Sequence, residues 1–182
     1  MALNTWSACC WIASHRYKTN GIGRLVAASD PMKAKIRTQG KGTFAMLKYA
    51  LAYVSTAVIF FILDFIWLSS MATNFYRARL PDIMAADVNY PAAVLFYLMY
   101  VAGVVIFAVT PALESGRWTT AAIYGALFGV MAYGTYDLTS QATLKQWSTA
   151  VTVVDMAWGT FVSASAASLS YLATKLLLSR FH

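Results

Sequence analysis

Four long apolar runs constrain the fold of this chain more than any other feature. They cover residues 49–71, 90–112, 118–137 and 148–172. A helix of about 20 apolar residues crosses the hydrocarbon core of a bilayer, so each run is long enough. Inside lipid the backbone N–H and C=O groups must be satisfied within the chain, which favours helices. The runs therefore predict an all-α fold, a four-helix transmembrane bundle formed by residues 46–182.

The composition agrees with a protein whose main partner is the lipid bilayer. Hydrophobic residues make up 59% of the 182 residues and charged residues only 12%. Soluble domains contain about 25% charged residues. A water-soluble globular domain is therefore a poor match to this chain.

Residues 1–45 differ in kind from the rest and predict a basic, disordered tail. They hold seven of the 14 Lys and Arg residues, a single acid (Asp30) and several Gly and Pro residues. No long apolar core of a secretory signal is present. Two alternatives are a translation start at Met46 and an organelle-targeting peptide. No aromatic-rich nucleic-acid-binding module accompanies the charge, so we expect no nucleic acid as a partner.

The distribution of basic residues predicts the orientation in the membrane. Four spans place both termini on the same side. With the amino terminus inside, the inner segments hold eleven Lys and Arg residues, and the outer ones hold three, which are Arg77, Arg79 and Lys145. The positive-inside rule then places both termini in the cytoplasm. If translation starts at Met46, the counts become four and three, and the asymmetry is small.

The positions of cysteine and histidine exclude several kinds of chemistry from the membrane body. Between Met46 and Phe181 the chain contains neither residue. Zinc sites with Cys or His ligands, His-ligated haem, Fe–S clusters, Cys nucleophiles and Ser-His-Asp triads are therefore excluded there. Any chemistry would use carboxylates, hydroxyls, basic side chains, tryptophans or a bound cofactor. No metal site is predicted, the cofactor is unknown, and the sequence does not decide whether the protein is an enzyme.

Three aspartates in or beside the apolar runs are the main site candidates. They are Asp64, Asp137 and Asp155. A charge within the bilayer is costly, and ionisable residues kept there usually have a function. With the amino terminus inside, all three lie towards the outer ends of their helices. The spacing therefore predicts one polar site in one leaflet, with Asp64 and Asp155 coupled and Asp137 at its mouth.

Small residues predict which helix faces pack together. Gly159, Ser163 and Ala167 follow Asp155 at intervals of four, which places all of them on one face of a helix. Small residues allow membrane helices to approach closely, so we expect Asp155 to face protein. A G-x-x-x-G spacing starting at Gly125 predicts a second packing face.

Further candidates for a ligand or proton site surround the acids. They are Tyr133, Tyr136, Lys145 and Trp158. In a functional site the carboxylates would share a proton, bind a hard cation or contact a polar head group, with Lys145 or Arg79 as counter-charge. The structural alternative is that Asp64 and Asp155 are hydrogen-bonded to neighbouring helices, and that Asp137 contacts water at the interface. Trp and Tyr near span ends would then be interfacial anchors.

Several segments also resemble a known family. LKYALAYVSTAVIFFILDFIWL, LFYLMYVAGVVIFAV, YGTYDLTSQATLKQW and VDMAWGTF resemble a bacterial family of integral membrane proteins, the domain of unknown function 2177 family. The resemblance covers about residues 46–172 in order, and YGTYDLT…ATLK…W…VDMAWGT is its most specific part. It implies the bacterial inner membrane as the location, but no activity.

We therefore expect an integral membrane protein with an outer-leaflet polar pocket that binds a small molecule or lipid. One alternative is a small proton-coupled transporter that acts as a homo-oligomer, with Asp64 as the proton site. Others are a lipid-modifying enzyme that uses carboxylates alone or with Mg²⁺ or Mn²⁺, and a non-catalytic assembly partner. Oligomerisation through the G-x-x-x-G face would favour transport, whereas a monomer with an enclosed pocket would favour binding or catalysis.

Overall fold

The computed structural model describes residues 31–80, 83 and 87–180, with side chains from residue 44 onward. The chain divides into two units between Ala45 and Met46, and the second unit, Met46–His182, contains the bundle. Helix α2 (Pro31–Met71) begins within the segment for which a tail is expected. A proline followed by good helix formers accounts for this start. Residues 1–30 of the expected tail lie outside the described residues.

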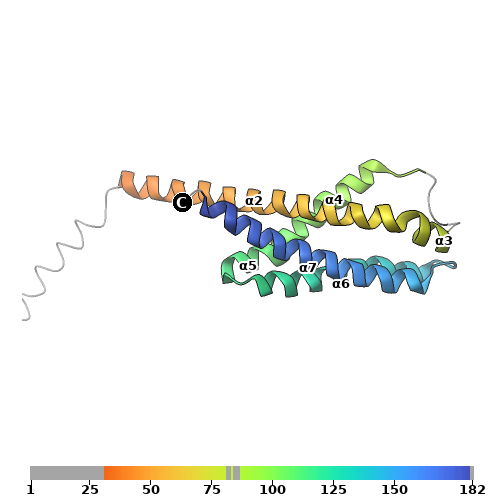
Figure 1. Cartoon of the computed structure of the whole chain (residues 1–182). Helices are drawn as coiled ribbons and strands as arrows, with labels where there is room; N and C mark the ends of the chain where they lie inside the picture. The colour runs from red at the N-terminus through yellow and green to blue at the C-terminus, as the bar shows by residue number, and fades with distance from the viewer. Residues whose placement is uncertain (1–30, 81–82, 84–86, 181–182) are drawn as a thin grey trace, which may run out of the picture. The chain divides into compact units, whose positions relative to one another are not determined.

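The regular structure of the described residues is entirely helical. After α2 come η1 (Ala72–Tyr76), α3 (Arg77–Arg79), α4 (Tyr90–Val104), η2 (Val105–Val109), α5 (Thr110–Ser115), α6 (Trp118–Thr143) and α7 (Thr149–Ser179). Helical segments that follow each other without a break form one continuous helix, which we call a rod. There are four rods: α2–η1–α3, α4–η2–α5, α6 and α7 (Figure 1). The predicted all-α, four-helix fold is confirmed.

Three of the four rods are long and apolar enough to cross a membrane. They cover Phe44–Arg79, Tyr90–Ser115 and Thr149–Ser179. Helix α6 has 26 residues, and at 1.5 Å per residue it is long enough, but its glycines, threonines and tyrosines make it less apolar. It packs antiparallel to α7, one of the three apolar helices. Large apolar side chains such as Phe65, Leu95 and Leu127 are exposed on the outside of the bundle, as lipid contact requires.

Two helices extend further than the apolar runs predict. The first rod continues through η1 and α3 to Arg79, beyond the apolar run that ends at residue 71, and α6 continues to Thr143, beyond the run that ends at residue 137. In α6 the hydroxyls of Thr135, Thr139 and Thr143 each donate to the carbonyl four residues earlier. These bonds satisfy the polar side chains without interrupting the helix. These threonine hydroxyls towards the end of α6 therefore need no hydrogen-bond partner from another helix.

The second rod shows how proline, asparagine and glycine shape a helix. The Asn89 side chain caps its start by accepting from the N–H of Ala92 at 3.2 Å, and Pro91 occupies the first turn. The π-helical turn η2 lies just before Pro111. Because proline has no N–H and its ring crowds the preceding turn, a widened turn relieves the conflict. Gly116, with φ of +70°, ends the rod in a left-handed conformation.

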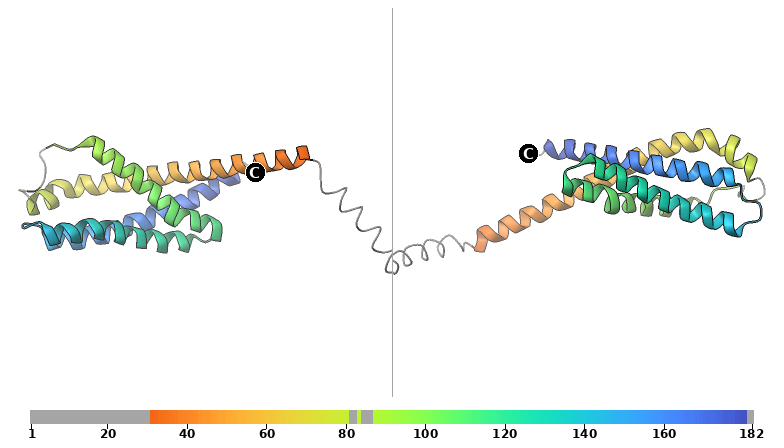
Figure 2. Two further views of the ribbon diagram at one scale, coloured as in Figure 1. Left: turned by 180° about the vertical axis from the view of Figure 1, so that it is seen from behind. Right: turned by 90° about the horizontal axis from the view of Figure 1, so that it is seen from below.

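Helices α6 and α7 lie side by side along their lengths (Figures 1 and 2). A Cβ atom added to Gly125 would lie 2.7 Å from the carbonyl oxygen of Ser163, and one added to Gly129 would overlap the carbonyl of Gly159. The predicted packing role of the G-x-x-x-G face is therefore confirmed, and α7 of the same chain covers that face. Asp155, Gly159, Ser163 and Ala167 are all buried, which confirms that this face of α7 points towards protein.

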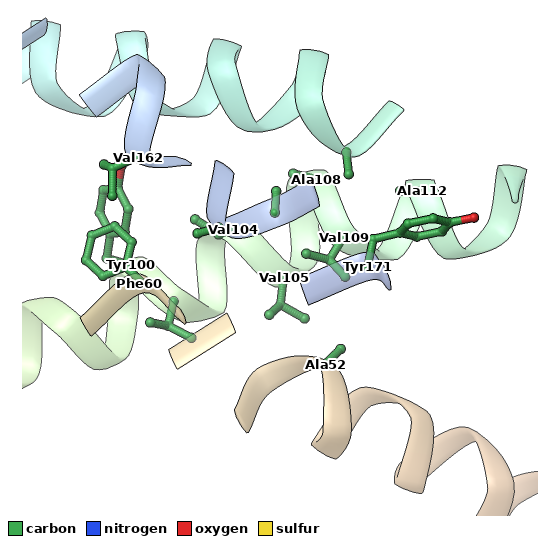
Figure 3. Packing of buried hydrophobic residues seen from close by; sticks show 14 residues of the cluster. Ala52, Phe60, Tyr100, Val104, Val105, Ala108, Val109, Ala112, Val162 and Tyr171 are labelled. Atoms are coloured by element: carbon green, nitrogen blue, oxygen red, sulfur yellow. The ribbon is translucent and has the colours of Figure 1, made fainter. Parts of the chain in front are cut away.

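Apolar packing joins the other helices to this pair. Figure 3 shows Phe60, Tyr100 and Val162 together, and the rings of Phe60 and Tyr100 have centroids 4.9 Å apart. Further along, the hydroxyl of Ser170 on α7 lies 2.6 Å from that of Thr56 and 3.0 Å from that of Ser55, both on α2. Hydroxyl pairs of this kind hold membrane helices together. The bundle is thus tightly packed in its middle and at this end.

Candidate functional site

At the opposite end of the bundle the four rods line a partly open cavity of about 500 Å³. Here the first rod and α6 approach their ends, while α4 and α7 begin. Two acids, Asp64 and Asp155, line it. The rest of the wall is mainly aromatic, formed by Trp67, Tyr76, Phe96, Tyr97, Tyr100, Tyr133, Tyr136, Trp147 and Trp158. A cavity of this size, with mostly apolar walls and few polar groups, is typical of a small-molecule site.

Asp64 of α2 is held from α4. It is 6% exposed, and the hydroxyl of Tyr97 donates to its Oδ2 at 2.6 Å. The indole N–H of Trp158 from α7 lies near the same carboxyl, but within the part of the chain that the structure describes it has no acceptor in hydrogen-bonding geometry. A buried N–H without an acceptor is costly. The Asp64 corner of the cavity thus keeps one polar group unpaired.

Asp155 of α7 is held from the end of the first rod. It is 8% exposed, and the hydroxyl of Tyr76 donates to its Oδ1. The indole N–H of Trp67 in turn donates to the hydroxyl oxygen of Tyr76 at 3.0 Å. Tyr76 is the last residue of the π-helical segment η1. A π turn takes up extra residues and rotates the next part of the helix, which is a common device at functional sites.

The two tryptophans connect these corners. The rings of Trp67 and Trp158 stack with centroids 4.2 Å apart and planes at 7°. Trp158 of α7 lies near the acid of α2, and Trp67 of α2 reaches the acid of α7 through Tyr76. The arrangement is reciprocal. Each of the two helices supplies one aspartate, and also the tryptophan that lies near, or is linked through Tyr76 to, the aspartate of the other helix.

Asp137 lies outside the cavity lining but close enough to Asp155 for the two carboxyl groups to interact electrostatically. It is fully buried and does not line the cavity, and neither of its oxygens has a hydrogen-bond partner among the described residues. On one side of it along α6, Gly134 faces Met156 of α7. On the other side, Gln141 donates to Thr149 of α7 at 3.0 Å. Asp137 is therefore buried within the α6–α7 packing, and not at the mouth of the site or in contact with water as expected.

The remaining candidates divide between the cavity and the surface. Tyr133, Tyr136 and Trp158 line the cavity, and Tyr136, which is 62% exposed, lies at its rim with its ring 5.6 Å from that of Trp147. Lys145 is exposed in the connection between α6 and α7 and does not line the cavity. The other proposed counter-charge, Arg79, lies over the ring of Phe75. No Lys, Arg or His occurs among the described residues that line the cavity.

The sequence interpretation missed three residues that contact the acids or their partners: Trp67, Tyr76 and Tyr97. Both Trp67 and Tyr76 lie near the end of the first apolar run, where the structural alternative treated Trp and Tyr as interfacial anchors. A signal for the first was present, because α2 contains DFIW from Asp64 and α7 contains DMAW from Asp155. Residues three apart share a helix face. The repeated D-x-x-W spacing therefore indicates that each tryptophan lies on the same helix face as an aspartate.

Comparisons with known proteins agree with this architecture and supply no ligand. Residues 49–172 match the model of the family described as "Predicted membrane protein (DUF2177)". The matched region includes both D-x-x-W segments and most of each rod. No curated protein and no solved structure matches the chain.

Proposed function

The chain belongs to the DUF2177 family of membrane proteins, and we propose from this premise that it binds a small amphipathic molecule or lipid that enters from the bilayer. The observation that carries the proposal is the cavity of about 500 Å³ in which Asp64 and Asp155 share an aromatic wall. The rings would contact the apolar body of a ligand. The two carboxyl groups would orient its polar part.

The free-energy cost of burying two carboxyl groups in apolar helices supports a binding role. Each carboxyl group lies within a long apolar helix and is nearly buried. Ionisable groups at such depth are expensive, and a purely structural hydrogen bond could be made by neutral side chains. Tyr97 and Tyr76 hold the carboxyl groups at the cavity wall instead of pairing them with a basic residue. Their placement is what a site for a polar ligand group requires.

Helix packing favours binding over transport by an oligomer. The G-x-x-x-G face, through which copies of the chain could have associated, is covered by α7 of the same chain. That face is therefore unavailable for assembly. A single chain also supplies every described wall of the cavity. Proton-coupled transport with Asp64 as the proton site is the second candidate, supported by the burial of that acid within the first rod.

The proposed location is the cytoplasmic membrane of a bacterium, with both termini in the cytoplasm. The asymmetry of the basic residues supports this orientation. It places the cavity in the outer leaflet, because the cavity lies at the end of the bundle opposite to the C-terminal end of α7.

The proposal is tested by what co-purifies with the protein. The full chain is extracted in mild detergent, and bound lipids and small molecules are identified by mass spectrometry. Ala132→Trp would fill the cavity, whereas Leu127→Trp changes an exposed position on the same helix and serves as the control. We expect a molecule that is present with the wild type and the control but absent with Ala132→Trp. Identical profiles for all three proteins would overturn the proposal.

A further inference from the structure

We infer that the ligand is an amphipathic organic cation whose ammonium group binds among the acids and tryptophans that line this cavity, which are Asp64, Asp155, Trp67 and Trp158. This inference rests on the proposed binding function and specifies the chemical class of the ligand. Four features of the cavity carry it: its charge, the free oxygens of its acids, its rings and its apolar remainder.

The charge of the cavity selects the sign of the ligand. Its described lining contains two carboxyl groups and no Lys, Arg or His. A ligand with a carboxylate or phosphate head would bring like charges together in a medium of low dielectric constant. A cationic head would instead supply the missing counter-charge, as buried carboxylates require.

Each acid also retains hydrogen-bonding capacity. Tyr97 uses one oxygen of Asp64, and Tyr76 uses one oxygen of Asp155. Apart from the indole N–H of Trp158 beside Asp64, no further donor to either carboxyl group occurs among the described residues. A carboxylate has about four acceptor sites, so an ammonium group can approach without displacing either tyrosine.

The rings suit an organic ammonium group. Trp67 and Trp158 form the stack beside the acids, and Tyr97 and Tyr133 add further π-systems to the wall. Tryptophan is the best partner for cation–π contacts, and aromatic cages are the usual sites for quaternary ammonium groups. The indole N–H of Trp158 lies near Asp64 and adds a donor to this part of the wall.

A bare metal ion fits this site less well. No group of three or more His, Cys, Asp or Glu side chains converges among the residues that the structure describes. Ca²⁺ takes six to eight oxygen ligands, and Mg²⁺ requires near-octahedral geometry. Two carboxyl groups on separate helices with aromatic neighbours do not supply such a shell. The same neighbours are favourable for an organic cation.

The apolar residues that line the cavity explain why we propose an amphipathic ligand. Leu68, Ala72, Leu80 and Val151 also line it. These side chains offer contacts to an alkyl chain or another apolar group. Because the outside of the bundle also faces lipid, a ligand with an apolar tail can reach the cavity through the membrane.

Three probes with the same tail and different heads test the inference. They are dodecyltrimethylammonium, dodecyl maltoside and dodecyl sulfate, added below their micellar concentrations to the full chain in lipid nanodiscs. Binding is measured by the change in tryptophan fluorescence, because the proposed site contains the Trp67–Trp158 stack. We expect dodecyltrimethylammonium to bind at least about tenfold more tightly than the neutral probe, since only it makes cation–π and charge-assisted contacts. We expect no measurable binding of dodecyl sulfate.

Variants then assign the contacts. Asp64→Asn and Asp155→Asn should each weaken dodecyltrimethylammonium binding about tenfold, because each removes one charge partner. Glu114→Gln, at the opposite end of the bundle, should leave dodecyltrimethylammonium binding unchanged, and Ala132→Trp should abolish it. Equal weakening by Glu114→Gln would overturn the assignment to this cavity. The comparison of the three probes uses only the wild-type protein. It therefore tests whether the ligand is a cation even if a variant fails to fold.

The possible failures can be told apart. If the ammonium and maltoside probes bind equally and Ala132→Trp blocks both, the cavity binds apolar molecules and the inference about charge is wrong, while the proposed function stands. If none of the probes binds, the inference fails, and mass spectrometry of co-purified molecules decides the proposed function separately.

Discussion

The indole rings of Trp67 and Trp158 lie parallel with centroids 4.2 Å apart, although 91 positions separate the residues in the chain. The stack joins α2 to α7 at the wall of the cavity. Each of the two helices carries an aspartate three residues before its tryptophan. The antiparallel arrangement brings each ring towards the acid of the other helix. Stability and binding at this end of the bundle should therefore depend on the pair as a unit.

The first prediction concerns the energy of the stack. Trp67→Leu, Trp158→Leu and the double variant form a cycle whose coupling free energy should be about 1 kcal/mol, as for other aromatic pairs. The measurement is unfolding in detergent, followed by circular dichroism. Trp118, which is exposed near the start of α6, provides the control. Trp67→Leu and Trp118→Leu should add within about 0.5 kcal/mol. Additivity of the Trp67 and Trp158 variants as well would contradict the stacking.

The second prediction concerns the tyrosines that donate to the acids. Tyr97→Phe and Tyr76→Phe each remove one hydroxyl that donates to a carboxyl oxygen. Each should lower the free energy of unfolding by about 1–2 kcal/mol, because a buried polar group loses its partner. Tyr136→Phe is the matched control, because Tyr136 is exposed at the rim of the cavity. The idea fails if all three variants melt at the same temperature.

The third prediction concerns close packing of α6 on α7. Gly129→Ala should cost about 1–3 kcal/mol or more, because the added methyl group meets the backbone carbonyl of Gly159 and the helices must separate. Gly134→Ala is the control on the same helix. Its methyl group would lie 3.2 Å from the end of the flexible Met156 side chain, which can move. Thermal unfolding of both variants checks the ranking, and a greater loss for Gly134→Ala would contradict it.

The fourth prediction concerns the unpaired acid inside the α6–α7 packing. Asp137→Thr should raise the free energy of unfolding by about 1 kcal/mol, since it removes a buried group without a partner. A threonine hydroxyl at this position can donate to the carbonyl four residues earlier, as Thr135 and Thr139 do. Asp64→Thr should have the opposite sign, because Tyr97 would lose its acceptor. A destabilised Asp137→Thr would contradict this prediction.

The fifth prediction concerns orientation. Reporter proteins fused after Arg117 and after Arg180 should report the cytoplasm, and fusions near Arg79 and Lys145 the opposite side, because basic residues favour the inside. Alkaline phosphatase and a fluorescent protein report the two sides independently. A cytoplasmic signal near Arg79 would reverse the proposed orientation and place the cavity in the inner leaflet.

Periodicity and composition predicted the parts of the molecule that depend on local or one-dimensional properties. The four helices follow from apolar runs, because lipid leaves the backbone little alternative to the helix. The burial of Asp155 follows from small residues at intervals of four, because side-chain direction along a helix is set by its pitch. The packing role of the glycine at position 125 follows from its lack of a side chain. Each of these properties is determined within a single helix.

The site itself depended on the tertiary structure. The spacing of the aspartates placed Asp137 at the mouth of one shared site, whereas the structure buries it between α6 and α7, and only Asp64 and Asp155 line the cavity. The difference arises from how the helices are rotated against one another and from the extension of α6 to Thr143. Tyr76 likewise reaches Asp155 through a π-helical turn. Such contacts join residues far apart in sequence, and their geometry is set by packing between helices, which a one-dimensional pattern does not contain.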